Sequence, residues 1–322
     1  MTVDVVIPTR DRPTQLASTL SRLMQQNSKE FGVIVVDDGS AVEAQRSLPD
    51  QLRGGLAIRF IRNDVSIGPG PSRNRGVDAS RARYVVFLDD DCSAVPGLIA
   101  RHSAVLADAS GPVVSLGPIL PPRGQRLSVW NHWDADRLGR EYNRLRDGIR
   151  TPAWTHLYTG NAALRREDFL AVGGFDARFR RQEDMELGYR LDRLGCRFEF
   201  DADATVFHDS SDRSLDGWSR RPAASAHFDV LMDRLDPDSG RLAAVLAQLD
   251  DKHWALRIAR RVIRTPAGRR HVAKSAMNAG RLLHGVRADR AGMAAISLVW
   301  DLSYCEALRE ARLRPDSEWS SP

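Results

Sequence analysis

Short apolar runs alternate with helix-like stretches through the first half of the chain. The apolar runs occupy residues 3–7, 31–36, 57–61 and 84–88. Between the first two runs, Leu16, Leu20 and Leu23 recur at the spacing of one helical face, and residues 72–80 also fit a helix. Strands separated by helix-sized intervals tend to lie parallel. The pattern therefore predicts an α/β fold whose mostly parallel sheet carries helices on both faces.

The pattern becomes less regular in the second half. Further strands are expected at residues 113–116, 197–200 and 204–207, and helices at residues 167–173 and 183–194. Residues 117–152 show no clear period, and the pattern turns helical from about residue 215 to the end. We therefore expect a helical C-terminal extension after the α/β part.

The composition is that of an ordinary soluble globular protein, since 42% of the 322 residues are hydrophobic and 28% are charged. No stretch approaches the roughly 20 apolar residues that cross a bilayer. The start of the chain lacks the basic and apolar regions of a signal peptide. Cys92, Cys196 and Cys305 show no metal or disulfide spacing, which favours a reducing compartment. These features predict a cytoplasmic protein.

The net charge of +5 is unevenly distributed. Residues 252–290 contain eleven Lys or Arg and one acid, Asp289, so this segment carries +10 and the rest of the chain −5. Within it, residues 254–264 place apolar side chains at helical spacing opposite four arginines. Such a helix either binds anionic lipid, as a peripheral contact at the inner face of the membrane, or packs on the protein with its arginines in solvent. No nucleic-acid recognition motif accompanies the charge, so we expect no nucleic-acid partner.

Carboxylates follow two of the apolar runs directly. Asp37 and Asp38 come after the second run, and Asp89, Asp90 and Asp91 come after the fourth. Because ligands of parallel sheets bind beyond the carboxyl ends of the strands, these acids are expected to meet at one edge. Three adjacent carboxylates repel one another and lose water there, and a divalent cation with oxygen ligands removes that cost. The alternative is a solvated acidic turn.

Seven short motifs between residues 3 and 210 occur in an order and spacing typical of one enzyme family. They are residues 5–12 (VVIPTRDR), 35–40 (VVDDGS), 72–76 (SRNRG), 87–91 (FLDDD), 160–161 (GN), 173–176 (GGFD) and 182–188 (QEDMELG). Together they closely resemble the family 2 glycosyltransferases, inverting enzymes of the Rossmann-like GT-A fold that use nucleotide sugars. The resemblance implies a nucleotide-sugar-binding half at residues 1–115 and an acceptor-binding half with the catalytic base at residues 116–214. The helical extension then covers residues 215–322.

The resemblance assigns a metal site to the acidic run. Asp89 and Asp91 match the Asp-x-Asp motif of the family, with Asp91 in direct contact with the metal, and Asp90 would face the ribose or the sugar. His208 matches a histidine that serves many family members as a further ligand. A divalent cation neutralises the leaving diphosphate, and a neutral imidazole suits Mn²⁺ better than Mg²⁺. A lone histidine at a strand end is otherwise structural or exposed.

The nucleotide would be held near the ends of the first strands. Asp38, with Asp37 as a second choice, would accept a hydrogen bond from the imide N–H of uracil or thymine, which selects the base. The alternative is a polar turn after the strand. The other nucleotide-binding candidates are Pro8, Thr9, Arg10, Arg73, Asp89 and Asp90. Arg73 at a helix start suits a phosphate, and the alternative is an exposed helix cation.

Glu183 and Asp184 match the catalytic pair of the family. Asp184 would be the general base, removing the acceptor's proton as it attacks the anomeric carbon opposite the nucleotide, which inverts the configuration. Glu183 would support the site. Acids in a first helical turn are also ordinary partners of the helix dipole. Weaker candidates for contacts with the donor or acceptor sugar are Gly160, Asn161 and Trp133. A tryptophan face stacks on sugars, although most tryptophans pack in the core.

The predicted function is therefore metal-dependent, inverting transfer of a sugar from a UDP- or dTDP-sugar, with Mn²⁺ or Mg²⁺. The acceptor would be a glycan, a lipid-linked glycan or a small natural product. Two alternatives share parts of the pattern. A sugar nucleotidyltransferase needs a glycine-rich loop after the first strand, and residues 8–13 contain no glycine. A non-catalytic nucleotide-sugar-binding protein needs no general base, and the Glu183–Asp184 pair argues against it.

Overall fold

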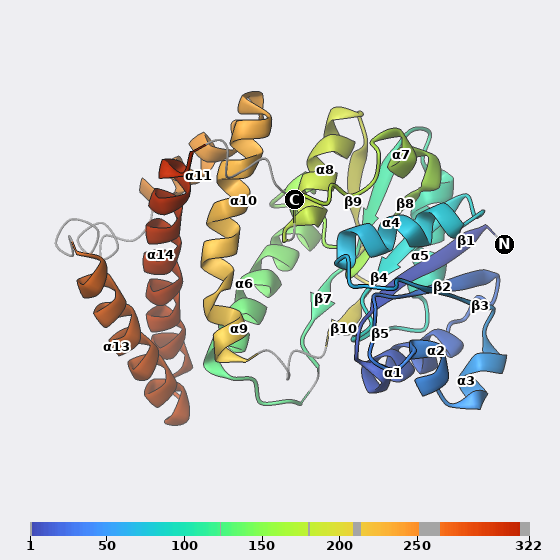
Figure 1. Ribbon diagram of the computed structural model, residues 1–322, viewed down its shortest axis with the longest axis horizontal. Helices are drawn as coiled ribbons and strands as arrows, with labels where there is room; N and C mark the ends of the chain where they lie inside the picture. The colour runs from blue at the N-terminus through green and yellow to red at the C-terminus, as the bar shows by residue number, and fades with distance from the viewer. Residues whose placement is uncertain (1, 123, 180, 209–213, 251–264, 316–322) are drawn as a thin grey trace. The chain divides into compact units, whose positions relative to one another are not determined.

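The computed structural model describes residues 2–122, 124–179, 181–208, 214–250 and 265–315 (Figure 1). The chain forms two compact units. The first contains Met1–Gly124 and Gly139–Asp209, and the second contains Gln125–Leu138 and Ser210–Pro322. The division of the chain near residues 115 and 214 stays a prediction.

A seven-stranded sheet runs through the first unit in the order β3-β2-β1-β4-β8-β6-β9. Its strands are β1 (Val3–Thr9), β2 (Phe31–Asp37), β3 (Ile58–Arg62), β4 (Tyr84–Leu88), β6 (Val113–Leu116), β8 (Asn161–Arg165) and β9 (Arg197–Phe200). All pairs are parallel except those of β8, which is antiparallel to both β4 and β6. A smaller sheet joins β5 (Cys92–Ala94), β10 (Val206–His208) and β7 (Ile119–Leu120).

The helices of the first unit cover both faces of this sheet (Figure 1). They are α1 (Pro13–Met24), α2 (Ala44–Ser47), α3 (Asp50–Gly55), α4 (Pro69–Ala79), α5 (Leu98–Asp108), α7 (Arg166–Ala171) and α8 (Glu183–Arg193), with the short 3-10 helix η1 (Trp154–His156). The expected α/β class with a mostly parallel sheet is confirmed. The elements not expected from the sequence include strand β8, helix α5 and helix α6 (Val129–Arg146), which lies inside the stretch without a clear period.

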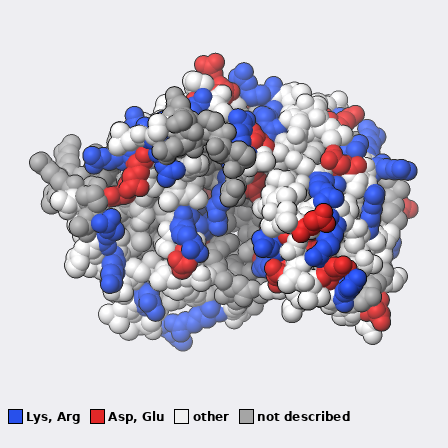
Figure 2. Space-filling model, viewed as in Figure 1, with Lys and Arg blue, Asp and Glu red and all other residues white. Residues whose placement is uncertain are grey.

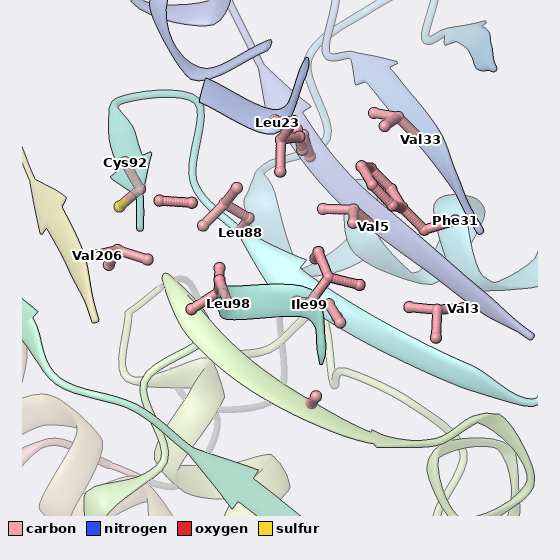
Figure 3. Close-up of a cluster of buried hydrophobic side chains, with 14 of the residues drawn as sticks. Val3, Val5, Leu23, Phe31, Val33, Leu88, Cys92, Leu98, Ile99 and Val206 are labelled. Carbon is pink, nitrogen blue, oxygen red and sulfur yellow. The ribbon is translucent and has the colours of Figure 1, made fainter. Parts of the chain in front are cut away.

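Alternate residues of the central strands pack on opposite faces of the sheet. Val5 and Leu88 belong to the cluster on the α1 and α5 face, together with Leu23, Leu98 and Ile99 (Figure 3). The intervening residues join side chains of α4, α7 and α8 in a second cluster: Val6, Phe87, Val77, Phe169, Leu187 and Leu191. Because the strands are buried on both faces, they appear in the sequence as continuous apolar runs and not as alternating ones.

The second unit is helical in its described residues. It contains the first part of α6 and the elements α9 (Leu215–Ser219), α10 (Arg221–Leu235), η2 (Pro237–Ser239), α11 (Arg241–Asp250), α13 (Pro266–Gly285) and α14 (Asp289–Leu313). The expected helical C-terminal part is thus confirmed. Its core includes three mutually packed rings, with centroids 5.2 to 5.9 Å apart, from Trp133, Trp218 and Trp300.

The predicted basic helix at residues 254–264 lies outside the described residues. On the face shown in Figure 2, the described Lys and Arg side chains are spread over the surface with Asp and Glu among them. Among the helices that the structure describes, none is both long and apolar enough to span a membrane.

Replacing Leu20 by alanine tests the packing of α1 on the sheet. Leu20 is fully buried in the cluster on the α1 and α5 face, so Leu20→Ala should remove about 2–5 kcal/mol of stability by leaving a cavity. Val42 is 64% exposed, and Val42→Ala should change stability by no more than about 0.5 kcal/mol. Urea unfolding followed by circular dichroism measures both. Equal effects of the two substitutions would contradict this packing.

Candidate active site at the carboxyl ends of the strands

Three adjacent parallel strands end at the same edge of the large sheet. β1 lies between β2 and β4 and is parallel to both, so Thr9, Asp37 and the residues after Leu88 come together. The backbone N–H of Asp38 donates to the carbonyl of Thr9 at 2.8 Å, which joins the first two strand ends. The predicted meeting of the acidic motifs at this edge therefore follows from the strand order.

Asp90 points into the protein and not toward open space. It is 4% exposed, and its two carboxylate oxygens accept hydrogen bonds from the Thr9 hydroxyl at 2.7 Å and from Arg12 at 2.9 Å. Its backbone carbonyl accepts a further bond from Thr19. Burial raises the pKa of Asp90 to about 6, against the opposing effects of Thr9 and Arg12. Asp90 thus fastens the acidic run to the loop after β1, and its expected contact with ribose or sugar stays a prediction.

The two carboxylate oxygens of Asp91 face two different side chains. Its Oδ2 atom accepts a hydrogen bond from Arg12 at 2.7 Å. Its buried Oδ1 atom has no hydrogen bond of good geometry among the described residues and lies 3.2 Å from His208 Nε2. Although burial opposes it, His208 and Arg12 lower the pKa of Asp91. The side chain is therefore an ionised carboxylate with one oxygen turned toward an imidazole nitrogen.

A group of four side chains could hold a divalent metal ion. Asp89, Asp91, Cys92 and His208 each offer one ligand atom, and these atoms lie within 4.8 Å of one another. Burial raises the pKa of the Cys92 thiol well above its usual value, and a soft sulfur suits Mg²⁺ or Mn²⁺ less well than carboxylate oxygens do. The two carboxylates and the imidazole remain. Neighbouring ligands of a small divalent ion lie roughly 3 Å apart, so the Asp91–His208 pair fits such an ion.

Arg73 joins the acidic run to the second acidic motif. Its side chain is 5% exposed, and its guanidinium contacts Asp89 at 2.5 Å and Glu183 at 3.3 Å. Although burial opposes it, Asp89 and Glu183 raise the pKa of Arg73. The alternative of an exposed helix cation does not hold, because this charge is buried and paired. Residues far apart in the sequence are thus brought into one site by a single side chain.

Glu183 and Asp184 lie in the first turn of α8. The preceding residue, Gln182, adopts a left-handed conformation with φ of 57°, which sets the direction in which the helix begins. Asp184 accepts a hydrogen bond from the Met185 amide at 2.9 Å. Burial and the neighbouring charge of Glu183 raise the pKa of Asp184 to about 7. Burial also raises the pKa of Glu183, while Arg73 opposes it. Asp184 can therefore accept a proton near neutral pH.

The two acids after β2 hold loops. Asp38 accepts four hydrogen bonds of 2.7 to 3.0 Å from the segment before α4: from the side chains of Asn63 and Ser66 and from the amides of Ile67 and Gly68. Asp37 accepts bonds from the amides of Ser40 and Ala44 and from Arg62. These bonds lower the pKa of both acids although burial opposes it. The role of Asp38 toward a nucleotide base stays a prediction.

The weaker candidates separate into two groups. A Cβ atom added at Gly160 would lie 2.9 Å from Asp89 Oδ2, so this glycine borders the acidic run. Asn161 is buried and donates to the carbonyls of Pro118 and Ala204, which makes it a structural link between strand ends. Trp133 belongs to the aromatic core of the second unit. Its expected contact with a sugar stays a prediction, as does that of Asn161.

Pro8 and Arg10 lie on either side of Thr9. Pro8 belongs to β1 and pairs with Val36 of β2. Arg10 is exposed, with its Nε 3.6 Å from Asp11. Arg12 touches both Asp90 and Asp91 and was not among the residues predicted from the sequence. Its place at the end of the first motif could have indicated this contact. The first and fourth strands were expected to end at the same edge of the sheet, which puts an arginine there near three carboxylates.

Comparisons with known proteins agree with this arrangement. The chain belongs to glycosyl transferase family 2, whose sequence pattern matches residues 4–173, more than half of the chain. Among solved structures, the mannosyltransferase PcManGT from Pyrobaculum calidifontis, in complex with GDP-Man and Mn²⁺, superposes with a TM-score of 0.65. It is 17% identical, and the match covers 97% of this chain and 87% of that one. TarS 1-349 from S. aureus, in complex with UDP, gives a TM-score of 0.54 at 16% identity, over 97% and 91% of the two chains. The expected GT-A fold is confirmed.

Curated relatives match over part of their length. The amylovoran biosynthesis glycosyltransferase AmsB of Erwinia amylovora is 29% identical over 60% of this chain and 65% of its own length. The pre-mycofactocin glycosyltransferase of Mycobacterium tuberculosis is 32% identical over 69% of this chain and 45% of its own. The matched part therefore spans about half to two thirds of these relatives.

Adding one methyl group at Gly160 tests the position of Asp89. The new Cβ would press on Asp89 Oδ2 and on Ile119 Cδ1, at 2.9 and 3.0 Å, and would move the carboxylate. Gly160→Ala should weaken Mn²⁺ binding, measured by calorimetry, by roughly tenfold or more. Gly111 has no atom within 4 Å of a built Cβ, so Gly111→Ala is the matched control. Unchanged Mn²⁺ affinity in Gly160→Ala would place the metal away from Asp89.

Proposed function

We propose that the protein transfers a sugar from a UDP- or dTDP-sugar to an acceptor hydroxyl in one metal-dependent, inverting displacement. One observation carries this proposal: buried Arg73 connects Asp89 of the acidic run with Glu183, directly beside Asp184. This contact would bring a cation-binding group and a proton acceptor into one site, and metal-dependent inverting transfer uses both.

Asp89, Asp91 and His208 would hold the metal. A bound divalent cation would neutralise the negative charge that develops on the leaving diphosphate. The closeness of Asp91 Oδ1 and His208 Nε2, 3.2 Å apart, supports this assignment, and PcManGT, which has a similar fold, was solved with Mn²⁺. The imidazole ligand favours Mn²⁺ over Mg²⁺.

Asp184 would act as the general base. Its carboxylate takes the proton of the acceptor hydroxyl, the hydroxyl oxygen forms a bond to the anomeric carbon, and the bond from that carbon to the diphosphate breaks. Attack on the side opposite the nucleotide inverts the configuration. Glu183 stays paired with Arg73 and raises the proton affinity of Asp184 by its charge, which places the base near the operating pH.

The donor nucleotide would be a pyrimidine diphosphate. A carboxylate such as Asp38 accepts a hydrogen bond from the imide N–H of uracil or thymine, which cytosine lacks. The UDP complex of TarS is compatible with this choice, whereas PcManGT was solved with GDP-Man. For the acceptor, AmsB takes part in amylovoran biosynthesis and the mycobacterial relative acts on pre-mycofactocin. These names support a glycan or a natural product.

The pH dependence of turnover tests the base. Only the carboxylate form of Asp184 accepts a proton, and its pKa is about 7. The turnover rate should therefore fall about tenfold per pH unit below pH 7 and level off above it. Asp184→Asn should bind UDP normally but lose roughly 100-fold or more of the transfer rate. Release of UDP in the presence of an acceptor found by screening measures turnover.

Asp192 provides the control for this substitution. It is an exposed acid on the same helix, and Asp192→Asn removes the same charge without entering the site. Turnover in that variant should be normal. Near-native turnover in Asp184→Asn would exclude Asp184 as the base.

Calorimetric titration with UDP, dTDP, GDP and CDP, each with and without Mn²⁺, tests the donor site. We expect metal-dependent binding of UDP or dTDP. The same binding should be lost in Asp91→Ala, because that substitution removes the carboxylate facing His208. A preference for GDP would refute the pyrimidine assignment. Unchanged nucleotide binding in Asp91→Ala would show that Asp91 is not part of the metal site.

A further inference from the structure

The acidic run is already paired with two arginines from separate elements. Arg12, at the start of α1, donates to Asp90 at 2.9 Å and to Asp91 at 2.7 Å. Arg73, from α4, donates to Asp89 at 2.5 Å. When all are ionised, the three carboxylates and two guanidinium groups sum to one negative charge, or to two with Glu183, which shares Arg73. This is a small charge for a site that binds a free divalent cation.

The two arginines differ in what they touch. Arg73 is almost fully buried and is shared with Glu183. Arg12 has a side chain that is 33% exposed, and it contacts Asp91, the carboxylate whose other oxygen faces His208. A positive charge bonded to a metal ligand repels an incoming cation and attracts an incoming anion. Arg12 is therefore placed to affect free metal and free diphosphate in opposite directions.

We propose that Arg12 is a positioning residue that selects the metal–diphosphate complex over the free metal ion. This inference rests on the metal site of the proposed function. Acting through Asp90 and Asp91, Arg12 disfavours a divalent cation that arrives alone and favours the diphosphate group. When the cation and the diphosphate enter together, the negative charge of the diphosphate compensates for the positive charge of Arg12. The site then fills with cation and donor as one unit.

A purely structural role would give a different pattern. If Arg12 only held Asp90 and Asp91 in place, its removal would loosen the ligands and weaken the binding of both metal and anion. The charge effect instead predicts shifts of opposite sign. The sign of the change for metal alone therefore separates the two explanations.

Mn²⁺ and inorganic pyrophosphate are the two probes, used on the full chain. Free Mn²⁺ is measured by electron paramagnetic resonance, and pyrophosphate binding in EDTA by calorimetry. Arg12→Gln should bind Mn²⁺ about fivefold or more tightly than the native protein and pyrophosphate about fivefold or more weakly. The affinity for the Mn²⁺–pyrophosphate complex should change less than the affinity for Mn²⁺ alone or for pyrophosphate alone. Arg22→Gln, an exposed change on the same helix, should leave all three unchanged.

A second variant keeps the test decisive if Arg12→Gln folds poorly. Arg12→Lys retains the charge but cannot bond both carboxylates in a fork, so its Mn²⁺ affinity should stay within about twofold of native. Equal or weaker Mn²⁺ binding in Arg12→Gln, or fivefold weaker Mn²⁺ binding in Arg12→Lys, would overturn the inference. Asp91→Ala separates the two proposals: if it leaves Mn²⁺ binding intact, the proposed metal site is wrong.

Discussion

The site depends on the burial of one positive charge. Removing a guanidinium from water costs several kcal/mol unless charged partners surround it. Arg73 is 5% exposed on its side chain, so acidic partners must lie against it. Asp89 and Glu183 meet that need from opposite parts of the sequence. The same contact fixes the distance between the end of β4 and the start of α8. The geometry of the candidate site is therefore a consequence of pairing this charge.

Charge balance also explains why so many acids are tolerated in one place. Asp90 is paired with Arg12, and Asp91 is shared between Arg12 and His208. Asp184 differs from them, since its side chain accepts a hydrogen bond from the Met185 backbone amide, and burial with the charge of Glu183 raises its pKa to about 7. The acid with the least compensation is the one whose proton affinity suits proton transfer. The partners of Asp91 lower its pKa, whereas burial and the charge of Glu183 raise the pKa of Asp184, which fits its proposed role as a base.

The sequence predicted what depends on local pattern and missed what depends on distant partners. Strands β1, β2 and β4 were found because burial on both faces makes them unbroken apolar runs. Strand β8 was missed because its short run, with Ala162 and Ala163, carries little β-branched character. The proximity of Asp91 and His208 was expected through family resemblance and was found at 3.2 Å. The burial of Arg73 had no local signal, since its partners come from other segments.

The two halves of the proposed donor site are connected through the backbone of one short segment. Asp38 accepts a hydrogen bond from the amide of Gly68, which immediately precedes α4. Arg73 follows within the first turns of that helix and pairs with Asp89. The four hydrogen bonds that Asp38 accepts all come from residues 63–68. A ligand that replaces one of these bonds would therefore affect the segment that leads into α4. A ligand at Asp38 is therefore coupled, by this segment, to the arginine that orders the acidic run.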